Sequence, residues 1–102
     1  MGTPVVAAAD GLVAAVATDD GYGRHIVIAH AAASTLYAHL KAFATGLRPG
    51  QMISQGQTIG YVGRSGRATG THLHFEVTEN RRWVDPQLVL GPVVSGRQLA
   101  QR

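Results

Sequence analysis

Two histidines one residue apart, His72 and His74, are the residues of this sequence best suited to chemistry, and Glu76 follows at the same spacing. Successive side chains of a β-strand point to opposite faces, so a strand here places all three polar side chains on one face. Two imidazoles so placed can bind one zinc ion together, or one can bind the metal while the other transfers a proton. The alternative is a polar strand face that holds no ligand.

A third imidazole, His39, belongs to an alternating stretch over residues 34–40. The alternation predicts a strand on which Thr35, Tyr37 and His39 share a polar face. If this strand lies beside the strand of the histidine pair, three imidazoles converge on one point. The alternative for His39 is a histidine that is hydrogen-bonded in the interior.

The two remaining histidines are less suited to catalysis. We expect His25 to be solvated beside Arg24, and His30, at the end of a predicted strand, to have a structural role at a turn. The glycine-rich residues 66–70 lead into His72. Glycines allow a backbone to come close to a substrate, which favours a site near this segment.

The elements that position these side chains are short apolar stretches separated by turn signals. Asp10-Gly11 and Pro49-Gly50 are turn dipeptides, and no stretch shows a convincing helical period. We predict strands at residues 12–18, 24–29, 34–40, 58–62 and 72–78. Several short strands with regular turns indicate an all-β fold, a compact antiparallel sandwich or barrel-like domain. We expect this domain to span residues 1–90, with residues 91–102 as a C-terminal tail.

The composition excludes several classes of protein. With 102 residues, 45% of them hydrophobic and 15% charged, the chain fits one folded domain and not a disordered segment. Its longest apolar run, residues 12–17, is far shorter than the ~20 residues that a membrane-spanning helix needs. The lack of cysteine excludes disulfides, thiolate ligands and a cysteine nucleophile. The net charge of +3 is scattered along the chain, so we expect no nucleic-acid partner.

Motifs along residues 2–90 occur in an order and spacing typical of one enzyme family. They are the opening Gly2-Thr3-Pro4-Val5, the turn Gly21-Tyr22-Gly23, the strand motif Tyr37-Ala38-His39-Leu40, the paired Gly50-Gln51 and Gly56-Gln57, the signature Thr69-Gly70-Thr71-His72-Leu73-His74-Phe75-Glu76, and the closing Asp85-Pro86. Together they resemble the lysostaphin/LytM-type zinc metallopeptidases, which cleave peptide cross-bridges of bacterial peptidoglycan.

The resemblance implies a fold, a site and a substrate. The fold is a compact antiparallel β domain of the duplicated hybrid motif kind, built around a groove. Zinc is held by a His and an Asp of an upstream H-x-x-x-D motif and by His74, while His39 and His72 act on the metal-bound water and the developing oxyanion. The implied partners are peptidoglycan or muropeptides, and the implied location is extracytoplasmic, in the periplasm, the cell wall or the medium. The first residues of the chain show no signal peptide.

The family's H-x-x-x-D motif precedes the segment that starts at Gly2, and here only Met1 precedes it. Two of the three expected ligands therefore have no counterpart in this sequence, and we expect weak zinc binding because metal affinity depends on several ligands fixed together. Three explanations stay open: a fragment of an active enzyme, a degenerate member that binds without cleaving, or substitute ligands from His25 or a partner chain. A missing first strand also leaves an exposed sheet edge, which favours homodimers.

Three further functions compete with the zinc endopeptidase. The first is a non-catalytic peptidoglycan-binding or regulatory module on the same fold. The second is a lipoyl or biotinyl carrier, which Lys41 argues against because it lacks the flanking residues of a modified lysine. The third is a histidine phosphocarrier with His39 and His72 as phosphoryl acceptors, which the H-L-H-F-E signature fits less well.

Overall fold

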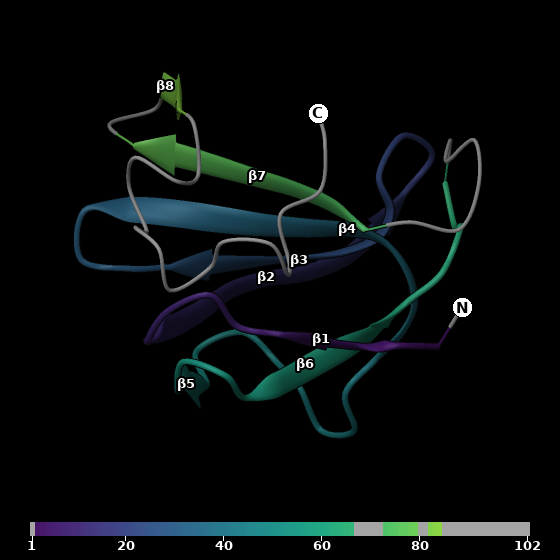
Figure 1. The fold of residues 1–102 in the computed structure, drawn as a ribbon, viewed down its shortest axis with the longest axis horizontal. Coiled ribbons are helices and arrows are strands. Elements are labelled where there is room, and N and C mark those ends of the chain that lie inside the picture. Colours follow the sequence, from purple (N-terminus) through teal and green to yellow (C-terminus); the bar gives the residue numbers. More distant parts are fainter. Residues whose placement is uncertain (1, 67–72, 80–81, 85–102) are drawn as a thin grey trace.

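Eight β-strands form one antiparallel sheet in the computed structural model, which describes residues 2–66, 73–79 and 82–84 (Figure 1). The strands are β1 (Pro4–Val6), β2 (Gly11–Asp19), β3 (Gly23–Ala29), β4 (Ala33–Phe43), β5 (Met52–Ile53), β6 (Thr58–Val62), β7 (His74–Glu79) and β8 (Arg82–Val84). The expected tail, residues 91–102, lies outside the described residues. The described part of the chain has no helix that is long and apolar enough to cross a membrane.

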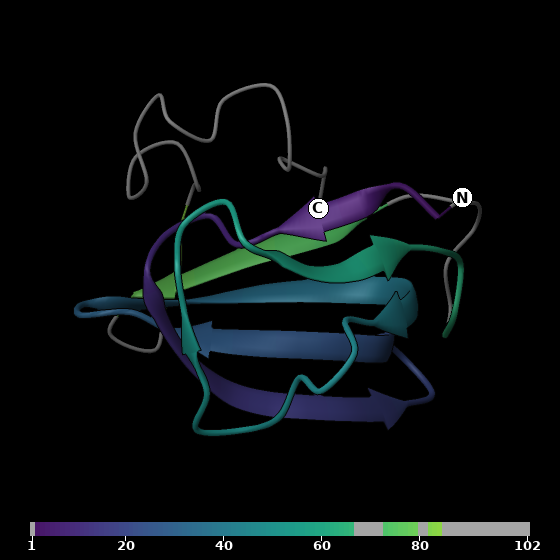
Figure 2. The same ribbon diagram turned by 90° about the horizontal axis from the view of Figure 1, so that it is seen from below.

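The sheet curls around a hydrophobic core. Pairing follows the order β1-β6-β4-β3-β2-β5, while β7 pairs with β4 and β8 with β7. In Figure 1, β2, β3, β4 and β7 lie on one side of the core, and β1, β5 and β6 lie on the other. Figure 2 shows the same curl from below. The predicted all-β, antiparallel and barrel-like fold is confirmed, in the form of one curled half-barrel sheet.

The central strand β4 has three partners because its pairing changes part-way along. Residues 33–38 pair with β7, and residues 40–43 pair with β6. On the β3 side, Ala38 and His39 stand opposite the single residue His25, which makes a β-bulge. His39 adopts a left-handed backbone conformation there, with φ at 61°. Because of this bulge, β4 can pair with β7 on one side of the core and with β6 on the other.

Apolar side chains from seven strands and the turn after β1 fill the inside of the curl. The core residues are Val5, Ala7, Ala8, Val13, Ile26, Ile28, Tyr37, Leu40, Ile53, Ile59, Phe75 and Val77. On β7, Phe75 and Val77 are fully buried on the face opposite to His74 and Glu76. On β4, the predicted polar face is wrong for Thr35 and Tyr37, because both are fully buried. The bulge interrupts strict alternation, so the core residues Tyr37 and Leu40 are three positions apart.

The buried hydroxyls of Thr35 and Tyr37 are satisfied by a short chain of hydrogen bonds. Their oxygens lie 2.9 Å apart, and the Ala8 amide donates to the Tyr37 hydroxyl at 3.0 Å. The His30 ring extends the chain, since Nε2 bonds the Thr35 hydroxyl at 2.9 Å and Nδ1 bonds the Asp10 carbonyl at 2.6 Å. His30 therefore has the structural role that its position predicted.

Strand β2 forms one edge of the described sheet for most of its length. β5 pairs only with Gly11 and Leu12, and the Val13 backbone is hydrogen-bonded to the loop before β5. No described strand pairs with the outer side of residues 14–18. This segment reads A-A-V-A-T, so it carries no charge or proline to protect the edge, and its irregularity is a register shift between Val13 and Ala15 in the pairing with β3.

Candidate functional site

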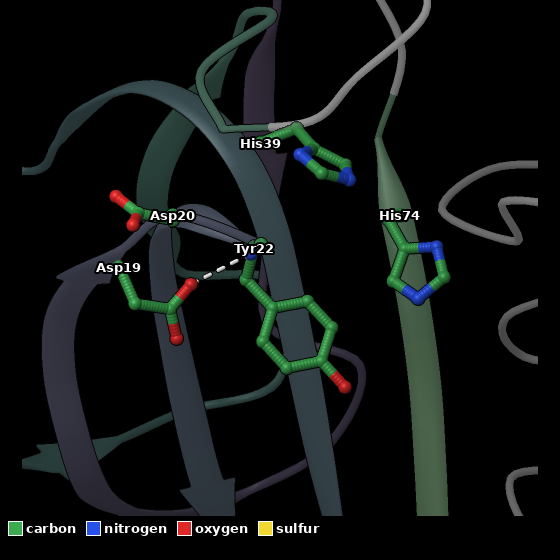
Figure 3. A pocket seen from close by; sticks show the side chains of 6 residues that line it. Asp19, Asp20, Tyr22, His39 and His74 are labelled. Carbon is green, nitrogen blue, oxygen red and sulfur yellow. Dashed lines mark hydrogen bonds between the residues drawn. The ribbon is translucent and has the colours of Figure 1, made fainter.

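A pocket of about 370 Å³ opens where the turn between β2 and β3 meets β4 and β7. It is lined by Asp19, Asp20, Gly21, Tyr22, His39 and His74. Figure 3 shows the rings of His39 and His74 extending from neighbouring strands, with the Tyr22 ring beside them. Two imidazoles, a phenol and two carboxylates therefore share one concave surface.

His39 occupies the bulge of β4 and is held there through backbone and ring. Its amide donates to the Tyr22 carbonyl at 2.8 Å, and its carbonyl accepts from the Gly63 amide at 3.2 Å. The ring Nδ1 lies 2.7 Å from the Ser65 carbonyl oxygen. A carbonyl can only accept, so Nδ1 carries the proton of the neutral ring, and Nε2 is the basic nitrogen.

Gly23 allows the chain at Ser65 to come close enough to hold His39. Its φ is 65°, and a Cβ at this position would overlap the Ser65 backbone. The Ser65 hydroxyl accepts from the Arg24 amide at 3.0 Å and donates to the Leu40 carbonyl at 2.7 Å. These contacts fix the carbonyl that orients the His39 ring.

His74 is the first residue of β7 and pairs with Ala38, next to the bulge. Its ring centroid lies 5.7 Å from that of His39, and the two ring planes meet at 70°. The ring Nε2 lies 2.7 Å from Oε2 of Glu76, which shares the strand face as the sequence predicted. A carboxylate accepts the hydrogen, so Nε2 carries the proton and Nδ1 of the neutral ring keeps its lone pair.

Tyr22 joins this pair from the turn between β2 and β3. Its hydroxyl donates to the Glu76 carboxylate, with oxygen distances of 3.2 Å and 3.1 Å. Its ring centroid lies 5.9 Å from that of His74. Burial, and then the hydrogen bond to the Glu76 carboxylate, raise the pKa of Tyr22 above its usual value. The hydroxyl is therefore a donor at neutral pH.

The structure brings together two of the three histidines that the sequence singled out. His39 and His74 line one pocket, whereas His72 lies outside the described residues and its place stays a prediction. His25 is half-buried, and its ring packs against Tyr22 with centroids 5.4 Å apart. Sequence reasoning gave Tyr22 no role beyond its motif. Tyr22 and Glu76 are 54 positions apart, so their contact depends on the topology alone.

No three His, Cys, Asp or Glu side chains within residues 2–66 and 73–79 lie close enough together to hold a metal ion. His74 fits the role of a single ligand, because metal-binding histidines usually donate their second ring N–H to a carboxylate or carbonyl. Glu76 is such a carboxylate, and its bond to Nε2 leaves Nδ1 for a metal. The described residues thus offer one ligand of the tetrahedral set that zinc prefers.

Comparison with known proteins decides the family of this domain. The model of peptidase family M23 matches residues 1–86. The chain belongs to this family. Its predicted membership among the lysostaphin/LytM-type peptidases is confirmed.

Two curated relatives of this M23 chain are bacterial peptidases. The DD-carboxypeptidase/endopeptidase Mpg of Neisseria meningitidis is 44% identical over 92 residues, covering 89% of this chain and 21% of Mpg. The peptidoglycan DD-endopeptidase ShyA of Vibrio cholerae is 35% identical over 105 residues, covering 99% of this chain and 24% of ShyA. The chain thus spans about a fifth to a quarter of the length of these relatives.

Solved structures of M23 proteins share the fold. A zinc-containing peptidase from Vibrio cholerae superposes with a TM-score of 0.78 at 40% identity, over 82% of this chain and 26% of that protein. The catalytic domain of lysostaphin from Staphylococcus simulans superposes with a TM-score of 0.80 at 29% identity, over 88% of this chain and 71% of that domain. The curled sheet is therefore the M23 fold.

Proposed function

We propose that this M23 domain is a zinc-dependent endopeptidase domain that cleaves peptide cross-bridges of bacterial peptidoglycan outside the cytoplasm. The observation that carries the proposal is the placement of the His39 and His74 rings, 5.7 Å apart, in one pocket. The endopeptidase names of Mpg and ShyA support the reaction, and the name of ShyA supports the substrate. The zinc-containing peptidase of the same fold supports the metal.

In the proposed site, His74 would hold zinc through Nδ1, together with ligands beyond the described residues. Zinc, when bound, polarises the scissile carbonyl and lowers the pKa of water towards about 7. Glu76 keeps the proton of His74 on Nε2, away from the metal. Tyr22 and the preceding turn residues form one wall of the pocket beside His74.

His39 is proposed as the general base. The Ser65 carbonyl holds Nδ1–H, so Nε2 accepts a proton from the attacking water. The protonated ring then donates this proton to the leaving amine. His72 is proposed as the second imidazole, which donates a hydrogen bond to the developing oxyanion.

The test is turnover of purified cross-linked muropeptides in the presence of zinc, followed by mass spectrometry. We expect cross-linked dimers to be converted to monomers, and His39→Ala to lower kcat by about 10²–10⁴-fold because a general base is lost. Removal of zinc with a chelator should abolish turnover, and added zinc should restore it. The control is Thr45→Ala, because Thr45 is exposed in the loop after β4 and does not line the pocket.

Two results would contradict the proposal. A His39→Ala variant that cleaves at the parental rate would remove the general base from the mechanism. Binding of the parental chain to purified sacculi without any cleavage, at a zinc concentration at which calorimetry shows the metal bound, would favour the alternative, a non-catalytic peptidoglycan-binding or regulatory module. Sedimentation with sacculi measures that binding directly.

A further inference from the structure

We propose that Tyr22 and Glu76 are positioning residues that fix the ring orientation and the tautomer of His74. Their effect on catalysis rests on the proposed function, but the positioning itself does not. Tyr22 lines the pocket and its hydroxyl contacts Glu76, and no step of the mechanism above uses Tyr22 as a donor to substrate. Three hydrogen bonds and the backbone contacts of Tyr22 support this role.

Glu76 is well placed to orient His74 because both side chains leave β7 on the same face. The carboxylate reaches back two residues to Nε2 at 2.7 Å, and both side chains are mostly buried, with 18% and 20% of their surface exposed. A glutamate on an open strand face has several rotamers available. A bond from one oxygen to His74 does not by itself fix the other oxygen.

Tyr22 supplies that second constraint. Its hydroxyl contacts both Glu76 oxygens, at 3.2 Å and 3.1 Å, so the carboxylate is held between a phenol and an imidazole. A carboxylate has about four lone-pair positions and can accept both hydrogens at once. These hydrogen bonds form a relay from Tyr22 through Glu76 to His74, in which the Glu76 carboxylate accepts from both neighbours.

The backbone of Tyr22 is fixed as firmly as its hydroxyl. Its amide donates to Asp19 Oδ1 at 2.7 Å, and its carbonyl accepts from the His39 amide at 2.8 Å. One residue therefore holds both histidines of the pocket: His39 through the main chain and His74 through Glu76. Tyr22 therefore constrains both histidines, in addition to the pairing of Ala38 with His74 that brings them together.

The first test observes the relay in the metal-free chain by NMR of labelled histidine. We expect neutral His74 to carry its proton on Nε2, with an Hε2 signal that exchanges slowly with water. In Glu76→Ala, the exchange of this proton with water should become too fast to observe. In Tyr22→Phe, the exchange should be about tenfold faster than in the parent. The controls are Glu79→Ala on the same strand and Tyr61→Phe on β6, which should change neither signal.

The second test links positioning to catalysis. Loss of a partner that orients a metal ligand typically costs about 10–100-fold in metal affinity or activity. We expect Glu76→Ala and Tyr22→Phe to lower kcat/KM on muropeptides within this range, with Glu76→Gln recovering part of the loss because its amide oxygen still accepts from Nε2. Backbone amide spectra of each variant check that the fold is intact.

The outcomes separate the two proposals. A His74 proton on Nδ1, or an Hε2 exchange rate unchanged in both variants, would overturn the positioning role. A protected Hε2 proton in a chain that cleaves no muropeptide would overturn the endopeptidase function and leave the positioning intact. Unchanged kcat/KM in an active chain whose variants have lost Hε2 protection would show that the relay has no effect on catalysis.

Discussion

Tyr37 shows how a single polar side chain can be kept in the core of this domain. Its ring is fully buried and packs against Phe75, with centroids 5.2 Å apart. Burial raises the pKa of its hydroxyl, while the hydrogen bonds with Thr35 and from the Ala8 amide act in the opposite direction. The hydroxyl remains neutral and joins β4 to the turn that follows β1.

We expect Tyr37→Phe to destabilise the fold by about 1–3 kcal/mol, the usual cost of leaving a buried donor without its acceptor. The Ala8 amide loses its partner in this variant, and the Thr35 hydroxyl keeps only His30. Urea unfolding measures the change in free energy. Tyr61→Phe is the matched control and should stay within about 0.5 kcal/mol of the parent, as substitutions away from buried networks usually do. An unchanged midpoint for Tyr37→Phe would show that the hydroxyl is dispensable.

The bulge in β4 is the element that the sequence did not predict. Alternation over residues 34–40 correctly predicted a strand, but it placed Tyr37 on a polar face, because a period of two cannot reveal an inserted residue. The hypothesis of converging histidines required β4 to lie beside β7, and the pairing of Ala38 with His74 confirms that it does. Tyr22 was missed because nothing local relates the turn after β2 to β7.

The left-handed φ of His39 allows a test of the bulge itself. We expect His39→Gly to be more stable than His39→Ala by about 1 kcal/mol, because glycine adopts positive φ without the steric cost that a Cβ brings. Both variants lose the same ring and the same bond to Ser65, so their difference isolates the backbone. In an ordinary strand position, alanine is the more stable of the two. If thermal unfolding shows that His39→Ala is more stable than His39→Gly, the result would argue against the bulge.

At the scale of the whole molecule, the outer edge of β2 is one strand edge of the described sheet that is open to a partner. The uncharged residues 14–18 present an unpaired strand side within the described sheet. Uncharged strand edges of this kind pair readily with a second chain. Homodimer formation through a sheet edge therefore stays a prediction, and the structure supplies β2 as the strand to examine.

We expect the parent to show a concentration-dependent monomer–dimer equilibrium in sedimentation experiments. Ala17→Lys should shift it to monomer, because a charge on an exposed edge position opposes pairing. The control substitution is Thr45→Lys, in the loop after β4. A parent that remains a monomer at high concentration would remove β2 as a dimer interface.

The order of the strands along the chain also bears on how the protein is made. His39 is synthesised with β4, but His74 and Glu76 belong to β7, which leaves the ribosome only after most of the sheet. Chains are synthesised from the N-terminus, and early parts begin to fold first. A nascent chain that ends before β7 has most of the core strands but only one of the two pocket histidines. The pocket is therefore completed only after β7 has been synthesised and has docked beside β4.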